Sequence, residues 1–109
     1  MGAGYVGTVS ADLHLPTSGS LKDKRRELRR LVARLRNHHH CAAAEVDYQD
    51  LWQRAQVTVA LVGSDASELG ARLEAVSRAF HTDAAFVVVD ELRDLRPVAG
   101  EPPYLGGPA

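Results

Sequence analysis

The spacing of apolar residues changes several times along this chain, between a period of two and a period of three to four. A period of two is typical of a half-buried strand, and a period near 3.6 is typical of an amphipathic helix. Residues 5–15 alternate apolar and polar side chains, whereas residues 20–36 repeat apolar side chains three and four positions apart. The strand-like segments are residues 5–15, 41–48, 53–63 and 84–92, and the helical ones are residues 20–36 and 66–80.

The resulting order is βαββαβ, which predicts a ferredoxin-like fold of the α+β class. Right-handed crossovers place both helices on one face of a four-stranded antiparallel sheet and leave the other face open. The strand order of this topology is 4-1-3-2. The side chains expected on the open face are Thr8, Ser10, Asp12, Arg54, Gln56 and Thr58, together with Cys41, Ala43, Glu45 and Asp47 of the second strand.

The length of 109 residues predicts one domain. We place this domain at residues 1–96, because residues 97–109 contain four Pro and three Gly and are expected to form a disordered tail. A single cysteine, Cys41, excludes an internal disulfide and fits the reducing cytoplasm. No apolar run approaches the roughly 18 residues of a membrane span. We therefore expect a cytoplasmic protein that does not enter a membrane.

The predicted first helix concentrates positive charge. Ser20 is a good N-cap with Asp23 three positions later. Residues 20–36 hold eight Lys or Arg and two Asp or Glu, a net charge of +6, while the rest of the chain carries −7. Such a segment is either a solvated surface or a surface for phosphate groups. The candidates for contact with RNA or phosphate are Lys22, Lys24, Arg25, Arg26, Arg29 and Arg36.

Other polar and aromatic clusters are weaker candidates. Leu51 and Trp52 lie at the predicted turn between the second and third strands, where they either pack onto the core or, with Arg54, form a partner interface. The run His38-His39-His40-Cys41 offers four metal-ligating side chains. Consecutive residues diverge, however, so we expect a polar loop there and no functional metal site.

Enzymatic activity has little support in the sequence. Asp12 and His14 share one strand face and Glu45 lies on another strand, so acid–base chemistry would require these strands to bring them together. No nucleophile elbow or phosphate-binding loop is present in a suitable context. We therefore expect no catalytic residues, no cofactor and no small-molecule substrate.

Two segments carry a resemblance to a known family. S-L-K-x-K-R at Ser20–Arg25 and E-V-D-x-Q-D-L-W-Q-R-A at Glu45–Ala55 resemble the bacterial YlxP-like family, a small domain of unknown function, and the similarity extends from Tyr5 to Leu95. The resemblance implies a ferredoxin-like fold. It also implies a link to translation, because such genes often lie beside those for a translation initiation factor and ribosome-binding factor A. The family has no established catalytic residues.

The charge segregation and this resemblance together suggest a module that binds structured RNA or a ribonucleoprotein, such as a ribosomal subunit, in ribosome assembly or translation. The basic helix would be the binding surface. The alternative is a protein-interaction module or homodimer that uses the open sheet face or the Leu51-Trp52 turn.

Overall fold

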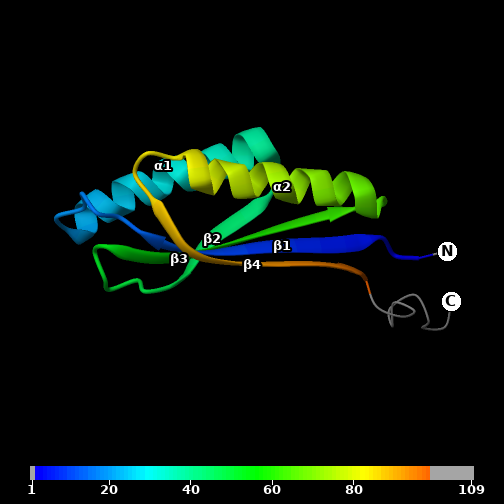
Figure 1. The fold of residues 1–109 in the computed structure, drawn as a ribbon, viewed down its shortest axis with the longest axis horizontal. Coiled ribbons are helices and arrows are strands. Elements are labelled where there is room, and N and C mark those ends of the chain that lie inside the picture. The colour runs from blue at the N-terminus through cyan, green and yellow to red at the C-terminus, as the bar shows by residue number, and fades with distance from the viewer. Residues whose placement is uncertain (1, 99–109) are drawn as a thin grey trace, which may run out of the picture.

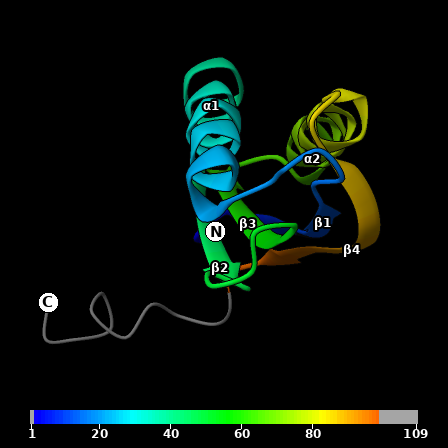
Figure 2. The same cartoon turned by 90° about the vertical axis from the view of Figure 1, so that its left-hand side faces the viewer.

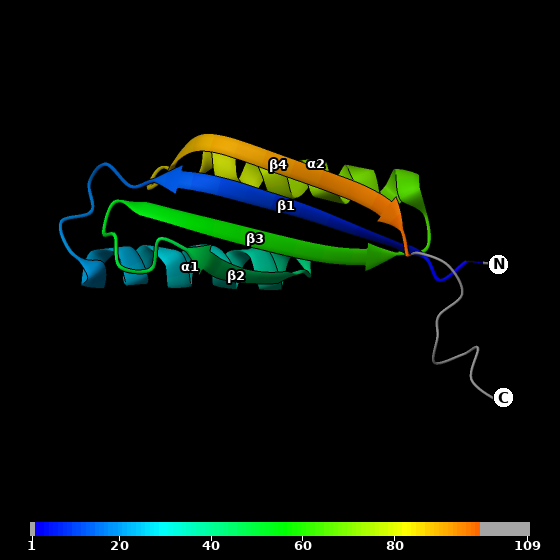
Figure 3. The same cartoon turned by 90° about the horizontal axis from the view of Figure 1, so that it is seen from below.

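The computed structural model describes residues 2–98, which contain four strands and two helices in the predicted order. The elements are β1 (Tyr5–His14), α1 (Leu21–His39), β2 (Ala42–Asp47), β3 (Arg54–Gly63), α2 (Ala66–Thr82) and β4 (Val87–Pro97). The strands form one antiparallel sheet in the order β2-β3-β1-β4. Figures 1 and 3 show both helices on the same face of this sheet. The ferredoxin-like α+β fold is thereby confirmed.

Both helices begin at side chains that cap free backbone N–H groups. Ser20 Oγ accepts a hydrogen bond of 3.0 Å from the N–H of Asp23, and the Asp23 carboxylate accepts one of 3.0 Å from the N–H of Gly19. Asp65 caps α2 in the same way. The first helix continues beyond residue 36 to His39, and the next residue, His40, caps it in a left-handed conformation. No helix in residues 2–98 is both long enough and apolar enough to cross a membrane.

The core lies between the sheet and the two helices, which run side by side across it (Figure 2). Alternate residues of β1 and β3 point toward the helices and are fully buried, because the pleat directs every second side chain to the same face. Leucines of α1 and the apolar face of α2 complete this core. The largest buried apolar side chains are Leu13, Leu15, Leu31, Leu35, Leu69 and Phe80.

The open face carries the polar residues expected from β1 and β3. Ser10 Oγ lies 2.9 Å from Thr58 Oγ1 and accepts a 2.8 Å hydrogen bond from Gln56 Nε2. Both nitrogens Nε and Nη2 of Arg54 donate to the Asp12 carboxylate. The predicted orientation of these two strands is therefore confirmed.

The predicted orientation of β2 is wrong for three of four residues. Ala43 is buried under α1, Glu45 meets a lysine of α1, and Cys41 Sγ donates to the carbonyl of Leu35. Residues 42–44 are all alanine, so the sequence does not distinguish a polar from an apolar face of this strand. A bulge between Glu45 and Asp47 then shifts the register by one residue, so that Asp47 lies opposite Gln56.

The last strand differs from its predicted boundaries. It was expected at residues 84–92 but spans Val87–Pro97, because it pairs with β1 along the whole of that strand, from His14↔Val87 to Tyr5↔Pro97. Pro97 thus belongs to β4 and not to the predicted tail. The remainder of that tail, residues 99–109, lies outside the described residues.

Candidate functional site

The basic residues of α1 fall into three groups that differ in their surroundings. One lysine is buried; three arginines, Arg26, Arg30 and Arg34, lie near acidic side chains; and the other four cations lie along one exposed side of the helix. These groups have the same charge in the sequence, so only their contacts distinguish them.

Lys24 is the buried member, with only 1% of its surface exposed. Its Nζ donates to the carbonyl oxygens of Tyr48, Gln49 and Arg54 at 2.8, 3.3 and 3.1 Å, and lies 2.9 Å from Glu45 Oε2. This carboxylate oxygen is buried and accepts no hydrogen bond within residues 2–98. Because the three ammonium protons are directed at carbonyls, the contact with Glu45 is an ion pair without a hydrogen bond.

The ammonium of Lys24 therefore has no access to an external phosphate, and its inclusion among the RNA-binding candidates is corrected. Its role is to hold the loop of residues 48–53 against the first turn of α1. A buried cation must be paired and hydrogen-bonded, and the loop carbonyls and Glu45 supply those partners. The two sequence segments that carry the family resemblance thus meet at this one side chain.

Arg26 and Arg30 are engaged by neighbouring acidic residues. Arg30 donates from Nη1 and Nη2 to both carboxylate oxygens of Asp83 at 2.8 Å, and also contacts Glu27 at 2.9 Å. The hydrogen bonds to Asp83 raise the pKa of Arg30 above its ordinary value. Arg26 lies 3.5 Å from Asp23. Most of the positive charge on this side of α1 is locally balanced.

The remaining cations form a stripe along the exposed side of α1, which we call the basic stripe: Lys22, Arg25, Arg29 and Arg36. Their spacing of three, four and seven positions places them on one side of a helix, over about 21 Å at a rise of about 1.5 Å per residue. All four are exposed. Within residues 2–98, the first three form no ion pair, and Arg36 donates at 2.8 Å to the carbonyl of Ala43.

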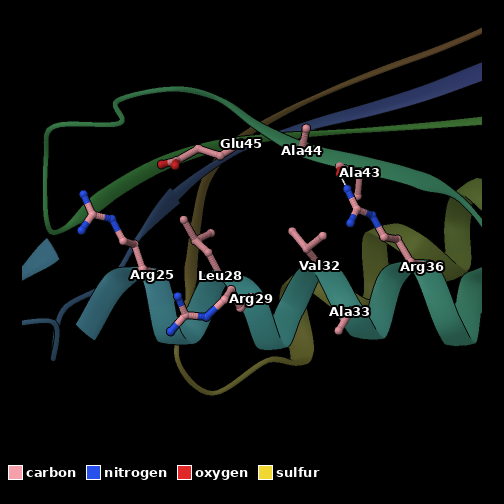
Figure 4. A pocket seen from close by; sticks show the side chains of 9 residues that line it. All are labelled: Arg25, Leu28, Arg29, Val32, Ala33, Arg36, Ala43, Ala44 and Glu45. Carbon is pink, nitrogen blue, oxygen red and sulfur yellow. Dashed lines mark hydrogen bonds between the residues drawn. The ribbon is translucent and has the colours of Figure 1, made fainter. Parts of the chain in front are cut away.

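A groove runs beside the basic stripe, between α1 and the edge strand β2. Its volume is about 520 Å³. Leu28 and Val32 point from α1 toward β2, and Arg36 reaches across to the carbonyl of Ala43 (Figure 4). The residues that line it are Arg25, Leu28, Arg29, Val32, Ala33, Arg36, Ala43, Ala44 and Glu45.

The sequence did not predict this groove. To predict the groove, one would need the orientation of β2, and the run of alanines in that strand does not reveal it. One would also need the distance between α1 and the edge of the sheet, which is set only when the structure packs. The groove gives the basic stripe a concave, largely apolar border. Together, the stripe and the groove form the candidate functional site.

The partner-interface candidates lie away from this site, at the loop between β2 and β3. Leu51 and Trp52 are 49% and 54% exposed, so they do not pack onto the core. Arg54 lies on the open face, where it pairs with Asp12 and its guanidinium lies 4.7 Å from the centroid of the Tyr48 ring. The hydrogen bonds that Arg54 donates to the Asp12 carboxylate raise the pKa of Arg54.

The histidine run and Cys41 have ordinary structural surroundings. Burial raises the pKa of the Cys41 thiol, and burial together with the charge of Arg34 lowers the pKa of His39. Among residues 2–98, no group of three or more His, Cys, Asp or Glu is arranged to hold a metal ion.

The structure does not bring together Asp12, His14 and Glu45, the three residues considered for acid–base chemistry. Asp12 and His14 lie on the open face of β1, and Asp12 is engaged by Arg54. Glu45 lies on the other face of the sheet, where it pairs with Lys24. A reaction that uses all three side chains has no geometric basis here.

Comparison with known proteins agrees with the resemblance carried by the two sequence segments. A family model described as a protein of unknown function (DUF503) matches residues 6–93. The uncharacterized protein YlxP of Bacillus subtilis (strain 168) is 32% identical over 71 residues, which cover 65% of this chain and 77% of that protein. This chain therefore belongs to the DUF503, or YlxP-like, family of proteins of unknown function.

Proposed function

We propose that this protein is a non-enzymatic module that binds structured RNA or a ribonucleoprotein through the basic stripe. One observation carries the proposal. Lys22, Arg25 and Arg29 lie side by side on the exposed surface of α1 without an ion pair in residues 2–98, although the chain as a whole is slightly acidic. Acidic residues are therefore available in the chain but are placed elsewhere. Closely spaced, unpaired cations are the typical surface for a phosphate backbone.

The open sheet face supports structured RNA over single-stranded RNA. Domains of related topology that read single strands stack bases on aromatic side chains of the central strands. Here the central positions hold Ser10, Gln56 and Thr58, which hydrogen-bond to one another, and Arg54, which is paired with Asp12. Recognition would therefore depend on the phosphate backbone and the shape of the RNA.

The more specific part of the proposal is that the RNA partner is ribosomal. The stripe has the length and charge for a short stretch of RNA backbone, and the resemblance implies a gene neighbourhood of translation factors. Ribosomal RNA supplies abundant helical backbone, so a ribosomal subunit or its assembly intermediate is the first partner to test. A role in ribosome assembly or translation would place the protein in the cytoplasm.

Titration of a fluorescent double-stranded RNA hairpin and of purified small ribosomal subunits tests the proposal. We expect the Kd of the wild type to rise steeply with salt, because each phosphate contact releases counterions. The double variant Arg25→Glu/Arg29→Glu should bind roughly tenfold more weakly or worse at low salt, and its salt slope should fall by about 2.

The matched control is Arg78→Glu/Arg96→Glu, which alters the net charge by the same amount at exposed sites away from the stripe. It should retain most of the wild-type affinity. Equal losses in both double variants would show that only total charge matters. Wild-type binding no tighter than that of Arg25→Glu/Arg29→Glu at low salt would contradict the proposal outright.

A second candidate function, interaction with another protein, rests on the exposure of Leu51 and Trp52 at the loop tip. Large exposed aromatic residues are frequent anchors of interfaces. Affinity capture at high salt would test it: a polypeptide retained by the wild type and by Arg25→Glu/Arg29→Glu should be lost with Trp52→Ala. Retention of the same polypeptide by Trp52→Ala would exclude the tip as the anchor.

A further inference from the structure

The second strand of the sheet has a free edge. β2 lies at one end of the strand order β2-β3-β1-β4, so β3 is its single neighbour in the described sheet. In an antiparallel pair, only alternate residues exchange hydrogen bonds with the partner strand, and the N–H and C=O groups of the others point away from it. Within residues 2–98, no backbone hydrogen bond outside the sheet involves Ala42–Asp47. This edge therefore offers backbone donors and acceptors to a further strand.

The groove beside this edge has the dimensions of an extended segment. The six residues of β2 span about 20 Å at about 3.3 Å per residue, and the basic stripe spans about 21 Å. Figure 3 shows α1 and β2 along the same edge of the molecule. The volume of about 520 Å³ lies within the usual range of ligand sites. A segment added to β2 would thus lie in the groove and beside the basic stripe.

The floor of the groove is apolar, and one edge carbonyl can already be reached from it. Leu28 and Val32 point from α1 toward β2, and Arg36 Nη2 donates to the carbonyl of Ala43 at 2.8 Å (Figure 4). Every second side chain of an added strand would face the helices and cover Leu28 and Val32. A main-chain N–H of that strand would replace the guanidinium of Arg36 at an edge carbonyl.

The rim of the groove is basic, which indicates the charge of its ligand. Arg25, Arg29 and Arg36 line the groove together with one acidic residue, Glu45. The Glu45 carboxylate already lies 2.9 Å from the ammonium of Lys24. An acidic partner complements this rim. A second copy that paired through its own β2 would instead bring another basic stripe beside this one, and like-charge repulsion opposes that arrangement.

The combination of an apolar floor and a free strand edge favours a polypeptide over RNA as the occupant of the groove. Phosphate groups can reach the exposed ends of the arginines, but they supply no series of N–H donors for the carbonyls of β2. An extended peptide supplies both donors and acceptors at the spacing of a strand, and its alternate side chains fill the adjoining surface.

We propose that an extended acidic segment of another protein binds in this groove as a fifth strand, next to β2. Its main chain pairs with the free edge, its apolar side chains contact Leu28 and Val32, and its carboxylates pair with Arg25 and Arg29. This inference goes beyond RNA binding. Because both ligands use Arg25 and Arg29, the bound segment would exclude RNA from the basic stripe.

Titration of the full chain with a labelled synthetic peptide tests the inference. The probe alternates valine with glutamate over about eight residues, within the usual length of a strand. Its control is the same peptide methylated on every main-chain nitrogen, which keeps the side chains and their charge but cannot donate main-chain hydrogen bonds. We expect the unmethylated peptide to bind at least about tenfold more tightly and to slow amide hydrogen exchange in β2.

A variant of the groove floor separates this inference from RNA binding. Val32→Asn should weaken peptide binding at least about tenfold, because it places a polar group on the apolar floor. It should leave the affinity for an RNA hairpin nearly unchanged, because no charge is altered. Val62→Asn makes the same change at a position of β3 that is 71% exposed and should retain peptide binding. Thermal unfolding checks that Val32→Asn is folded, and the methylated peptide decides the question without any variant.

Equal affinities for the methylated and unmethylated peptides would overturn the proposal, as would unchanged peptide binding by folded Val32→Asn. Slower exchange in β2 that appears in the wild type alone as its concentration rises would assign the edge to a second copy. The same slowing with a double-stranded RNA hairpin would assign the groove to RNA, and either result would also overturn the proposal. Peptide binding by a chain that does not bind RNA would contradict only the proposed function.

Discussion

Replacing Lys24 with methionine should lower the free energy of unfolding by about 3–5 kcal/mol, the range found when one partner of a buried ion pair is removed. The methionine side chain has nearly the same length, so the loss is electrostatic rather than a cavity. The change leaves the carbonyls of Tyr48, Gln49 and Arg54 without their donor. It also leaves the Glu45 carboxylate beside an apolar group.

This loss is large relative to the roughly 5–15 kcal/mol that stabilises a domain of ordinary size. Urea denaturation followed by circular dichroism measures it directly. Lys22→Met is the matched control, because it makes the same chemical change two positions earlier at an exposed site and should alter stability by less than about 0.5 kcal/mol. Similar midpoints for the two variants would show that the Lys24 contacts add little to stability.

A double-mutant cycle with Glu45→Gln separates the ion pair from the hydrogen bonds. We expect Glu45→Gln alone to cost less than Lys24→Met, because Glu45 is 21% exposed and can be solvated. The coupling between the two changes should be about 0.5–3 kcal/mol, as found for residues in contact. Strict additivity would mean that the carbonyl oxygens of the loop account for the whole effect of Lys24.

Replacing Asp83 with asparagine should lower stability by about 1.5–3 kcal/mol near neutral pH, the range for hydrogen bonds to charged groups. The side chain of Asp83 is 3% exposed and accepts both nitrogens of Arg30. It also accepts the N–H of Ala85 at 3.0 Å, so it fixes the chain at the end of α2. Asparagine keeps the shape but removes the charge.

The same change should alter the response of stability to acid. Burial raises the pKa of Asp83, but the hydrogen bonds from Arg30 and Ala85 outweigh burial and hold that pKa below its ordinary value. A carboxylate with a lowered pKa in the folded state stabilises it above the unfolded pKa near 3.9, and this contribution is lost as the pH falls through the folded pKa. The stability difference between wild type and Asp83→Asn should therefore narrow below about pH 4.

Thermal unfolding at a series of pH values would follow this convergence. Asp50→Asn is the control, since Asp50 is exposed and forms no ion pair within residues 2–98. It should leave the pH profile close to that of the wild type. A stability difference for Asp83→Asn that stays constant from neutral pH to pH 2 would show that the charge of Asp83 is not responsible.

The basic segment shows how far sequence reasoning reaches. The leucine spacing and the Ser20 cap correctly predicted an amphipathic helix with an exposed basic surface, because both depend on contacts within one turn of chain. Lys24 was harder to place. Its position near the apolar side was visible from Leu28 four residues later, but its partners are carbonyls 24 to 30 residues away along the chain.

The second strand, in contrast, could not be oriented from its sequence. Its existence was predicted, but its orientation was wrong, because alanines pack on either face and a bulge changes the register. The groove beside the basic stripe and the pairing of Glu45 with Lys24 both depend on that orientation. A site that requires the register of an apolar strand is therefore beyond what periodicity can predict.

The sequence by itself determined the order of the elements, the ferredoxin-like topology and the location of the excess positive charge, since these follow from local periodicity, capping and composition. Only the tertiary structure decided which cations remain exposed. It buried Lys24, paired Arg30 with Asp83 and left Lys22, Arg25 and Arg29 without acidic partners in residues 2–98. The physical reason is that a cation is free to bind an external group only if folding brings no acidic or carbonyl group near it. Those groups are distant in the sequence, so the sequence does not reveal them.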